Sequence, residues 1–173
     1  MRVFVTVGST QFDPLVAASI STPILHALRS RGYTNISVQC GNFKSVSDLV
    51  LPSGAETTNS VKDGVNVEAW RFKPTLQEEY ELADLIISHA GSGTILDVLR
   101  MGKALIVVPN PTLLHNHQAE LAEALAARGH LYASTIPDLP RVIESMDAGK
   151  LVPFPALDGS RFQAVLDEEM GYL

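Results

Sequence analysis

The fold of this chain is decided by one stretch, Leu85-Ile86-Ile87-Ser88-His89-Ala90-Gly91-Ser92-Gly93-Thr94-Ile95-Leu96-Asp97. Its first residues form a short apolar run typical of a buried strand, and the small residues after it predict a tight turn. From Ile95 the apolar residues recur with helical spacing up to Gly102, where the helix is expected to end. The stretch therefore predicts a strand, a glycine turn and a helix.

A junction of this kind is a candidate anion site. The first N–H groups of a helix and its dipole favour negative charge, and Gly91 and Gly93 would let a ligand approach the main chain closely. The expected ligand is a phosphate or diphosphate. Asp97 lies three residues after Thr94 on the same helix face, where its carboxylate could accept hydrogen bonds from sugar hydroxyls. The junction thus predicts a nucleotide or nucleotide-sugar site, and the alternative is an ordinary glycine turn with Asp97 in solvent.

The rest of the chain alternates predicted strands with predicted helices. Besides the strand of the central stretch, strands are expected at residues 2–7, 35–40, 65–72, 104–108 and 130–136. Helices are expected from Asp13 as N-cap, again after Pro23, from a capping box at 75–78, before Gly129 and before Gly149. Residues 41–64 are expected to be loops around short elements.

This alternation predicts the α/β class, as a single Rossmann-like domain with a mostly parallel sheet covered by helices on both faces. Residues 1–150 are expected to form the domain and residues 151–173 a C-terminal extension. Ligands of such sheets bind outside the carboxyl ends of the strands. The loops at residues 8–10, 90–94 and 110–118 leave those ends, so we expect them to converge on one pocket.

Composition and motifs exclude several other functions. A net charge of −6 argues against a nucleic-acid partner, and the single cysteine rules out an internal disulfide. No apolar run approaches the roughly 20 residues that span a bilayer, and a strand from Arg2 leaves no room for a signal peptide. The sequence holds no complete dinucleotide fingerprint, P-loop or nucleophile elbow. His115 and His117, without further ligands nearby, do not predict a metal site.

Three motifs, taken together and in order, point to a family. They are 4–10 (Phe-Val-Thr-Val-Gly-Ser-Thr) with Phe12-Asp13, 87–94 (Ile-Ser-His-Ala-Gly-Ser-Gly-Thr), and 116–118 (Asn-His-Gln) with Glu120-Leu121-Ala122. With them, nearly the whole chain resembles the cytosolic catalytic subunits of two-chain UDP-N-acetylglucosamine transferases, which add the second GlcNAc to dolichyl-diphosphate-GlcNAc. More distantly it resembles the donor-binding, C-terminal half of GT-B glycosyltransferases of family 28.

The resemblance implies a role for each matching position. Gly8, Ser9 and Thr10 would face the diphosphate and the cleft between the two halves of the enzyme. His89 would shape the phosphate turn rather than act as a base, and Asp97 stands where the bacterial relative has a glutamate on the ribose. The positions expected to bind the donor are Gly8, Ser9, Thr10, His89, Gly91, Ser92, Gly93, Thr94, Asp97, Asn116, His117 and Gln118. The last three match the segment that contacts the sugar in the family.

The same resemblance implies an inverting transfer from UDP-GlcNAc to dolichyl-diphosphate-GlcNAc, the second step of lipid-linked oligosaccharide synthesis for N-glycosylation. Such a transfer needs a base for the acceptor hydroxyl and stabilisation of the leaving UDP. The helix N-terminus supplies the second, so no metal or other cofactor is expected. The base is not identified in this chain and could lie on a partner. A noncatalytic nucleotide-sugar-binding regulatory module and a related polysaccharide glycosyltransferase are the alternatives.

The partner implied by the resemblance is a membrane-anchored, acceptor-binding subunit that recruits this cytoplasmic chain to the cytosolic face of the endoplasmic reticulum. A capping box at 160–163 predicts a short C-terminal helix, which Gly171 would end. Its apolar face is expected to hold Phe162, Val165, Leu166 and Met170. So short a helix needs a surface to pack on. The sequence leaves open this chain's own sheet, and the resemblance favours the partner.

Overall fold

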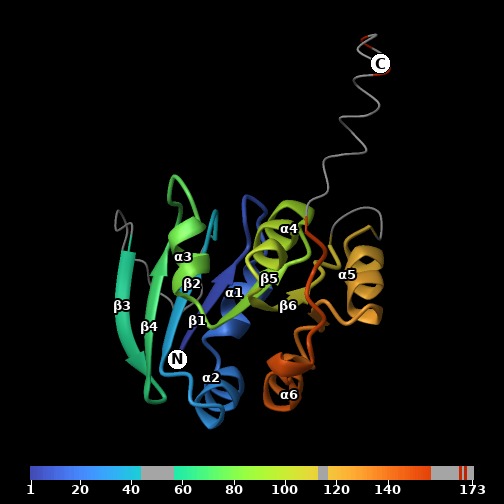
Figure 1. Ribbon diagram of the computed structural model, residues 1–173. Helices are drawn as coiled ribbons and strands as arrows, with labels where there is room; N and C mark the ends of the chain where they lie inside the picture. The colour runs from blue at the N-terminus through green and yellow to red at the C-terminus, as the bar shows by residue number, and fades with distance from the viewer. Residues whose placement is uncertain (44–56, 113–116, 157–167, 169, 171–173) are drawn as a thin grey trace.

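The computed structural model describes residues 1–43, 57–112, 117–156, 168 and 170 (Figure 1). Its seven-stranded sheet has the order β3-β4-β2-β1-β5-β6-β7. The strands are β1 (Arg2–Thr6), β2 (Asn35–Gln39), β3 (Thr57–Lys62), β4 (Val65–Trp70), β5 (Leu85–His89), β6 (Ala104–Val108) and β7 (Tyr132–Ala133). All neighbours pair in parallel except β3, which is antiparallel to β4. The predicted α/β class with a mostly parallel sheet is confirmed.

Helices cover both faces of the sheet. They are α1 (Asp13–Ser19), α2 (Thr22–Ser30), α3 (Gln77–Leu82), α4 (Ser92–Arg100), α5 (His117–Ala127) and α6 (Leu139–Ser145), followed by the 3₁₀ turn η1 (Ala148–Lys150). One core joins α1, α2 and α6 to side chains such as Val3 and Val5, and a second joins α3, α4 and α5 to the opposite face, which includes Phe4. Successive residues of a strand point to opposite faces, so a strand buried on both sides is mostly apolar.

The strand β3 was not assigned from the sequence, which predicted loops around short elements at 41–64. Residues 57–62 instead form an edge strand that returns through Asp63 and Gly64 into β4. Both turn residues have positive φ, 50° and 76°. That backbone is the two-residue hairpin turn for which Asp-Gly is a strong signal. The polar composition of β3 follows from its position, because its side chains are mostly exposed at the sheet edge.

Several predicted boundaries are corrected by one or more residues. Asp13 is the first residue of α1 rather than its N-cap, and Phe12 takes that position. The β4 strand ends at Trp70, before the predicted residue 72, and β7 keeps only two residues of the predicted 130–136. The second helix begins at Thr22, before the predicted start after Pro23, and holds Pro23 in its first turn. The predicted capping box at 75–78 does not form, because Leu76 is the N-cap of α3 and makes no side-chain capping hydrogen bond. Thr75 instead accepts a hydrogen bond from the Gln77 N–H (3.2 Å).

The chain after η1 packs back onto the domain. The Val152 N–H donates to the Gly129 carbonyl (2.9 Å), and His130 Nδ1 lies 2.9 Å from the Val152 carbonyl oxygen. The Phe154 ring meets the His130 ring edge-on, with centroids 5.3 Å apart. Of the predicted docking residues, Phe162, Val165 and Leu166 lie outside the described residues. Met170 is helical and 65% exposed.

The division of the chain at residue 150 stays a prediction. Within the described part of the chain, no helix is both long and apolar enough to cross a membrane.

Candidate functional site

Three loops leave the same edge of the sheet. The strands β1, β5 and β6 are parallel neighbours, and their last residues lie in register: Thr6 faces Ser88, and His89 faces Val108. The turn at 8–10, the start of α4 and the segment from Pro109 to Pro111 therefore follow three adjacent strands at their carboxyl ends, where ligands of open α/β sheets bind. We call this region the carboxyl-edge site.

The turn after β1 is held by a buried glutamine. Gly8 has a φ of +59°, which glycine adopts without strain. Its N–H donates to Gln39 Oε1 (3.0 Å), and its carbonyl accepts from Gln39 Nε2 (2.6 Å). Thr6 Oγ1 also donates to Gln39 Oε1 and accepts from the Gly8 N–H at 3.0 Å. The Gln39 side chain, 3% exposed, thus fixes the turn that presents Ser9 and Thr10.

Sequence reasoning missed Gln39. The available signal was an amide side chain at the end of a predicted buried strand, where an unpaired polar group would be costly.

The His89 ring fills the space between the two glycine segments. A Cβ added at Gly8 would lie 2.6 Å from His89 Cε1, and one at Gly91 would lie 2.3 Å from His89 Nε2. The ring is 6% exposed, and burial lowers the pKa of His89 from its ordinary value, with the Thr6 main chain opposing part of this shift. Burial therefore favours the neutral imidazole, and its ring leaves no room for a side chain at Gly8 or Gly91.

The N-terminus of α4 opens at this edge (Figure 1). Gly91 is the N-cap, and its carbonyl accepts from the Ile95 N–H (3.0 Å). The N–H groups of the first turn have no acceptor within the helix. Ser92 and Gly93 are exposed, and a Cβ added at Gly93 would meet nothing within 4 Å. The geometry leaves free main-chain donors beside an open surface, which is what an anion requires.

A buried tyrosine supports the first turn of α4. Tyr80, on α3, is 4% exposed and lies against the Phe4 ring, with centroids 5.8 Å apart. Burial raises the pKa of Tyr80, a hydrogen bond with Thr94 opposes that change, and the Asp97 carboxylate adds to it. The hydrogen bond with the buried Tyr80 thus fixes the Thr94 side chain, while Asp97 lies exposed on the same helix. Tyr80 was not predicted, since its pairing with Thr94 spans two elements.

The segment after β6 is tied to the start of α5. The Asn110 N–H donates to Gln118 Oε1 (3.0 Å), and Asn110 Nδ2 donates to the Gln11 carbonyl at 3.4 Å. Asn110 is buried and so links the loops after β1 and β6. His117 is largely exposed, with Nδ1 3.9 Å from Glu120 Oε2. Asn116 lies outside the described residues.

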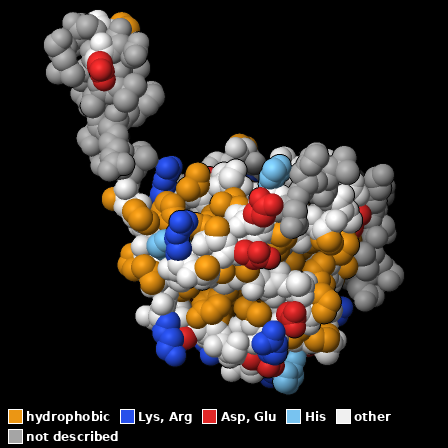
Figure 2. Space-filling view, turned by 90° about the vertical axis from the view of Figure 1, so that its right-hand side faces the viewer, with side chains coloured by type: hydrophobic (Ala, Val, Ile, Leu, Met, Phe, Trp, Pro, Cys, Tyr) orange, Lys and Arg blue, Asp and Glu red, His pale blue; other side chains and the backbone are white. Residues whose placement is uncertain are grey.

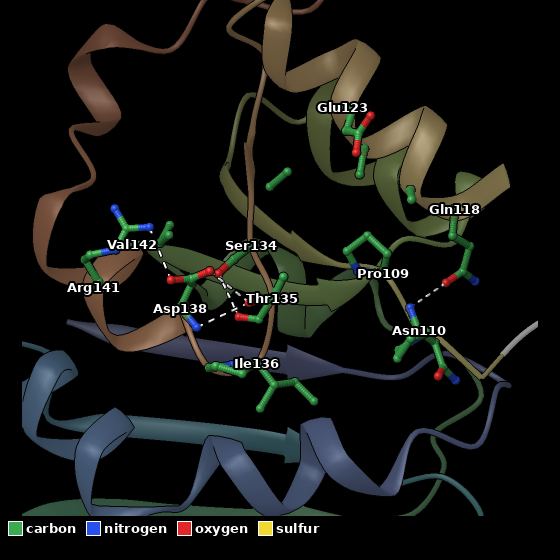
Figure 3. Close-up of a pocket in the computed structure, with 15 residues that line it drawn as sticks. Pro109, Asn110, Gln118, Glu123, Ser134, Thr135, Ile136, Asp138, Arg141 and Val142 are labelled. Atoms are coloured by element: carbon green, nitrogen blue, oxygen red, sulfur yellow. Dashed lines mark hydrogen bonds and ion pairs between the residues drawn. The ribbon is translucent and has the colours of Figure 1, made fainter. Parts of the chain in front are cut away.

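Asn110 and Gln118 also line a cavity of about 720 Å³ between α5, α6 and the end of β7 (Figure 3). Among the described residues, no group of three His, Cys, Asp or Glu side chains is placed to hold a metal ion.

Comparisons with known proteins agree with this geometry. The glycosyltransferase family 28 C-terminal domain matches residues 2–168. The UDP-N-acetylglucosamine transferase subunit ALG13 of Cryptococcus neoformans is 33% identical over 195 residues, covering 98% of this chain and 96% of the relative. The Saccharomyces cerevisiae subunit of that name is 30% identical, covering 96% and 94%. The mouse subunit is 40% identical over 134 residues, which are 78% of this chain but only 11% of the mouse protein.

Two solved structures share the fold. The NMR solution structure of ALG13 has a TM-score of 0.67 at 28% identity and covers 95% of this chain and 94% of its own. The crystal structure of Acinetobacter baumannii MurG has a TM-score of 0.60 at 25% identity, covering 87% of this chain and 42% of MurG. This chain thus corresponds to less than half of that enzyme. Because the family model spans nearly the whole chain, the chain belongs to the glycosyltransferase family 28 C-terminal domain family.

Proposed function

We propose that this chain is the donor-binding, catalytic subunit of a UDP-N-acetylglucosamine transferase that extends dolichyl-diphosphate-GlcNAc. The observation that carries the proposal is the meeting of the Gly8 turn, the α4 N-terminus and Gln118 at adjacent strand ends. The relatives named as UDP-N-acetylglucosamine transferase subunits support the choice of donor.

The diphosphate of the donor would lie against the first turn of α4. Free N–H groups at Ser92, Gly93 and Thr94 and the helix dipole favour a charged group there. These donors are fixed by Tyr80 behind Thr94 and by the His89 ring behind Gly91. As the bond from the sugar to UDP breaks, negative charge grows on the leaving diphosphate, and donors already in place stabilise it without reorganisation. This arrangement would let the transfer proceed without a metal ion.

The sugar and ribose would be read by side chains on either side of the diphosphate. Asp97 is exposed one helical turn after Thr94, where a carboxylate can accept from ribose hydroxyls. Gln118 keeps its Nε2 donor for the sugar, because its Oε1 accepts from the Asn110 N–H. Asn116 and His117 remain proposed sugar contacts.

A second chain would bring the acceptor. The chain covers 42% of MurG, so the remaining part of such an enzyme would come from a partner, and the relatives are themselves named subunits. We propose a membrane-anchored subunit that holds this chain at the cytosolic face of the endoplasmic reticulum, with docking through the C-terminal segment. Deleting residues 160–173 should remove the partner from pull-downs of this chain while its thermal melting stays cooperative. Normal co-purification of the truncated chain would overturn this docking site.

The function is tested in the complex captured from membranes through a tag on this chain. The assay follows GlcNAc transfer from radiolabelled UDP-GlcNAc to a short-chain isoprenyl-diphosphate-GlcNAc, with and without EDTA. Asp97→Ala removes a charged hydrogen-bonding group, which costs about 1.5–3 kcal/mol, or roughly 10- to 150-fold in donor KM. Arg100→Ala, also exposed on α4, is the matched control and should leave donor KM unchanged. An unchanged donor KM in Asp97→Ala would place this carboxylate outside the donor site, and a complex that transfers no GlcNAc would favour a noncatalytic module.

A further inference from the structure

The loop after β6 carries one main-chain donor between two prolines. Proline has no N–H group, so Asn110 is the one residue of 109–111 that can donate from its main chain. The prolines also stiffen the segment, because each fixes its own φ and Pro111 keeps Asn110 out of the helical region. The Asn110 N–H donates to Gln118 Oε1 at 3.0 Å. The segment therefore aims a single, well-fixed donor at one side chain of α5.

The Asn110 side chain holds this segment from two sides. Its Oδ1 accepts from the Thr112 N–H (3.1 Å) and from Thr112 Oγ1 (2.9 Å), closing the short turn that asparagine often forms with the residue two positions on. Its Nδ2 donates to the Gln11 carbonyl at 3.4 Å, and so reaches the loop after β1, two strands away in the sheet. Asn110 is 5% exposed, so these bonds are shielded from water.

The loop that Asn110 reaches is itself fixed. Gln11 Nε2 donates to Asp13 Oδ2 at 3.0 Å, in the first turn of α1. Gly8, at the other end of the same loop, is held by Gln39. A chain of hydrogen bonds therefore runs from α1 through Gln11 and Asn110 to α5, along the carboxyl-edge site.

This chain of bonds leaves the Gln118 amide one orientation. An amide oxygen accepts hydrogen bonds and an amide nitrogen donates them. Because Oε1 accepts from the Asn110 N–H, Nε2 points away from the loop (Figure 3). Turning the amide over would place Nε2 against the Asn110 N–H, donor against donor. Around it, the face that carries α5 and α6 mixes hydrophobic side chains with acidic and basic ones (Figure 2), so a neutral group there is recognised through hydrogen bonds of fixed direction.

We infer that Asn110 is a positioning residue for recognition of the donor, an inference that rests on the proposed function. Its side chain fixes the segment that aims an N–H at Gln118, and Gln118 presents Nε2 to the part of the donor that UDP lacks. Asn110 itself touches no substrate. Without its side chain the segment loses its bonds to Thr112 and Gln11, and the Gln118 amide can turn. The Gly8 turn stays in place, because Gln39 holds it separately.

The test compares UDP-GlcNAc with UDP. In the captured complex, the KM for UDP-GlcNAc is measured together with the inhibition constant of UDP. Asn110→Ala should raise this KM by about fivefold or more, the effect of losing one hydrogen bond, and leave the inhibition constant of UDP within twofold. A purely structural role would lower the amount of active complex, and with it the maximal rate, without changing the ratio of the two constants.

The matched control removes a hydrogen-bonded amide elsewhere. Asn66 Nδ2 donates to Asn35 Oδ1 at 3.0 Å, at the opposite edge of the sheet. Asn66→Ala should therefore match wild type in both constants. Asn110→Ser is the milder variant of the site: its hydroxyl oxygen can still accept from the Thr112 N–H, but it is too short to reach Gln11. It should raise the KM for UDP-GlcNAc in the same direction by less.

A double-mutant cycle tests whether Asn110 acts through Gln118. Gln118→Ala should raise the KM for UDP-GlcNAc by itself. In that background Asn110→Ala should change the KM less than twofold, because the side chain that it positions is already absent. Independent effects that multiply would separate the two residues and overturn the inference.

Other outcomes also overturn the inference. An equal rise in the KM and in the inhibition constant of UDP would mean that Asn110 supports the phosphate loops rather than Gln118. A lower maximal rate with unchanged constants would leave Asn110 a structural role, and so would the loss of cooperative melting in both Asn110 variants. A wild-type complex that transfers no GlcNAc would overturn the proposed function, and an unchanged KM in Gln118→Ala would overturn the proposed role of Gln118, whatever the Asn110 variants show.

Discussion

Replacing Gly93 by alanine should move stability and donor binding in opposite directions. A Cβ at this position meets nothing within 4 Å, and the backbone is that of an ordinary helix, so the methyl group costs no steric energy. Alanine is favoured over glycine within helices by up to about 1 kcal/mol, and we expect about half of that in the first turn. The same methyl group would stand where the diphosphate is proposed to approach, and UDP affinity should fall at least tenfold.

The neighbouring Gly91 supplies the matched comparison. Its added Cβ would lie 2.3 Å from His89 Nε2, about 1.2 Å inside an ordinary contact distance of about 3.5 Å. His89 is confined by Gly8 on its other side, so Gly91→Ala should destabilise the fold by about 1–3 kcal/mol, as overpacking does.

Urea unfolding gives the stability of both variants, and titration calorimetry with UDP gives the affinity. Gly93→Ala protein that is as stable as wild type and binds UDP normally would refute the placement of the diphosphate.

Two further predictions concern residues that support the site and the fold. Gln39→Leu removes the amide that is hydrogen-bonded to both main-chain groups of Gly8. The substitution should lower the free energy of unfolding by about 2–4 kcal/mol and weaken UDP binding. A loss below about 1 kcal/mol in urea unfolding would contradict this role of Gln39. Burial alone would raise the pKa of Glu79, but hydrogen bonds from Lys73 and Arg2 lower this pKa below its ordinary value. The ionised Glu79 carboxylate therefore contributes its full stabilisation above the unfolded-state pKa. That stabilisation is lost as the pH falls through the folded-state pKa. Glu79→Gln should flatten the acid side of a stability-against-pH profile, and an unaltered profile would count against the ion pairs.

The central parts of the fold could be predicted because local pattern determines them. The run Ala104–Val108 is apolar at every position, which is typical of a strand buried on both faces, and the structure has β6 at those residues. The glycine turn before α4 was recognisable from small residues between a strand pattern and a helix pattern. Both signals lie within a few residues of the feature that they predict.

The support of the site could not be predicted, because it depends on which strands become neighbours. Gln39 reaches Gly8 only since β2 lies beside β1, a pairing across 31 residues. Tyr80 reaches Thr94 only because α3 and α4 share one face of the sheet. The hairpin at Asp63 and Gly64 does have a local signal, because Asp-Gly is typical of a two-residue turn between strands. The donor-binding roles of the site residues, including Asp97 and Gln118, stay predictions.

The one tryptophan of the chain gives this fold an optical reporter. Trp70 is 1% exposed, stacks on Phe4 at 5.9 Å, and donates from Nε1 to Ser37 Oγ at 3.0 Å. Its emission should therefore be blue-shifted, and a quencher such as acrylamide should reach the indole only after unfolding. Lys73 Nζ lies 4.5 Å from the ring centroid and is paired with Glu79. Protonation of the Glu79 carboxyl would break its ion pair with Lys73 and change the charge beside the indole, so the fluorescence of a single residue should report the ion pair before the fold itself is lost.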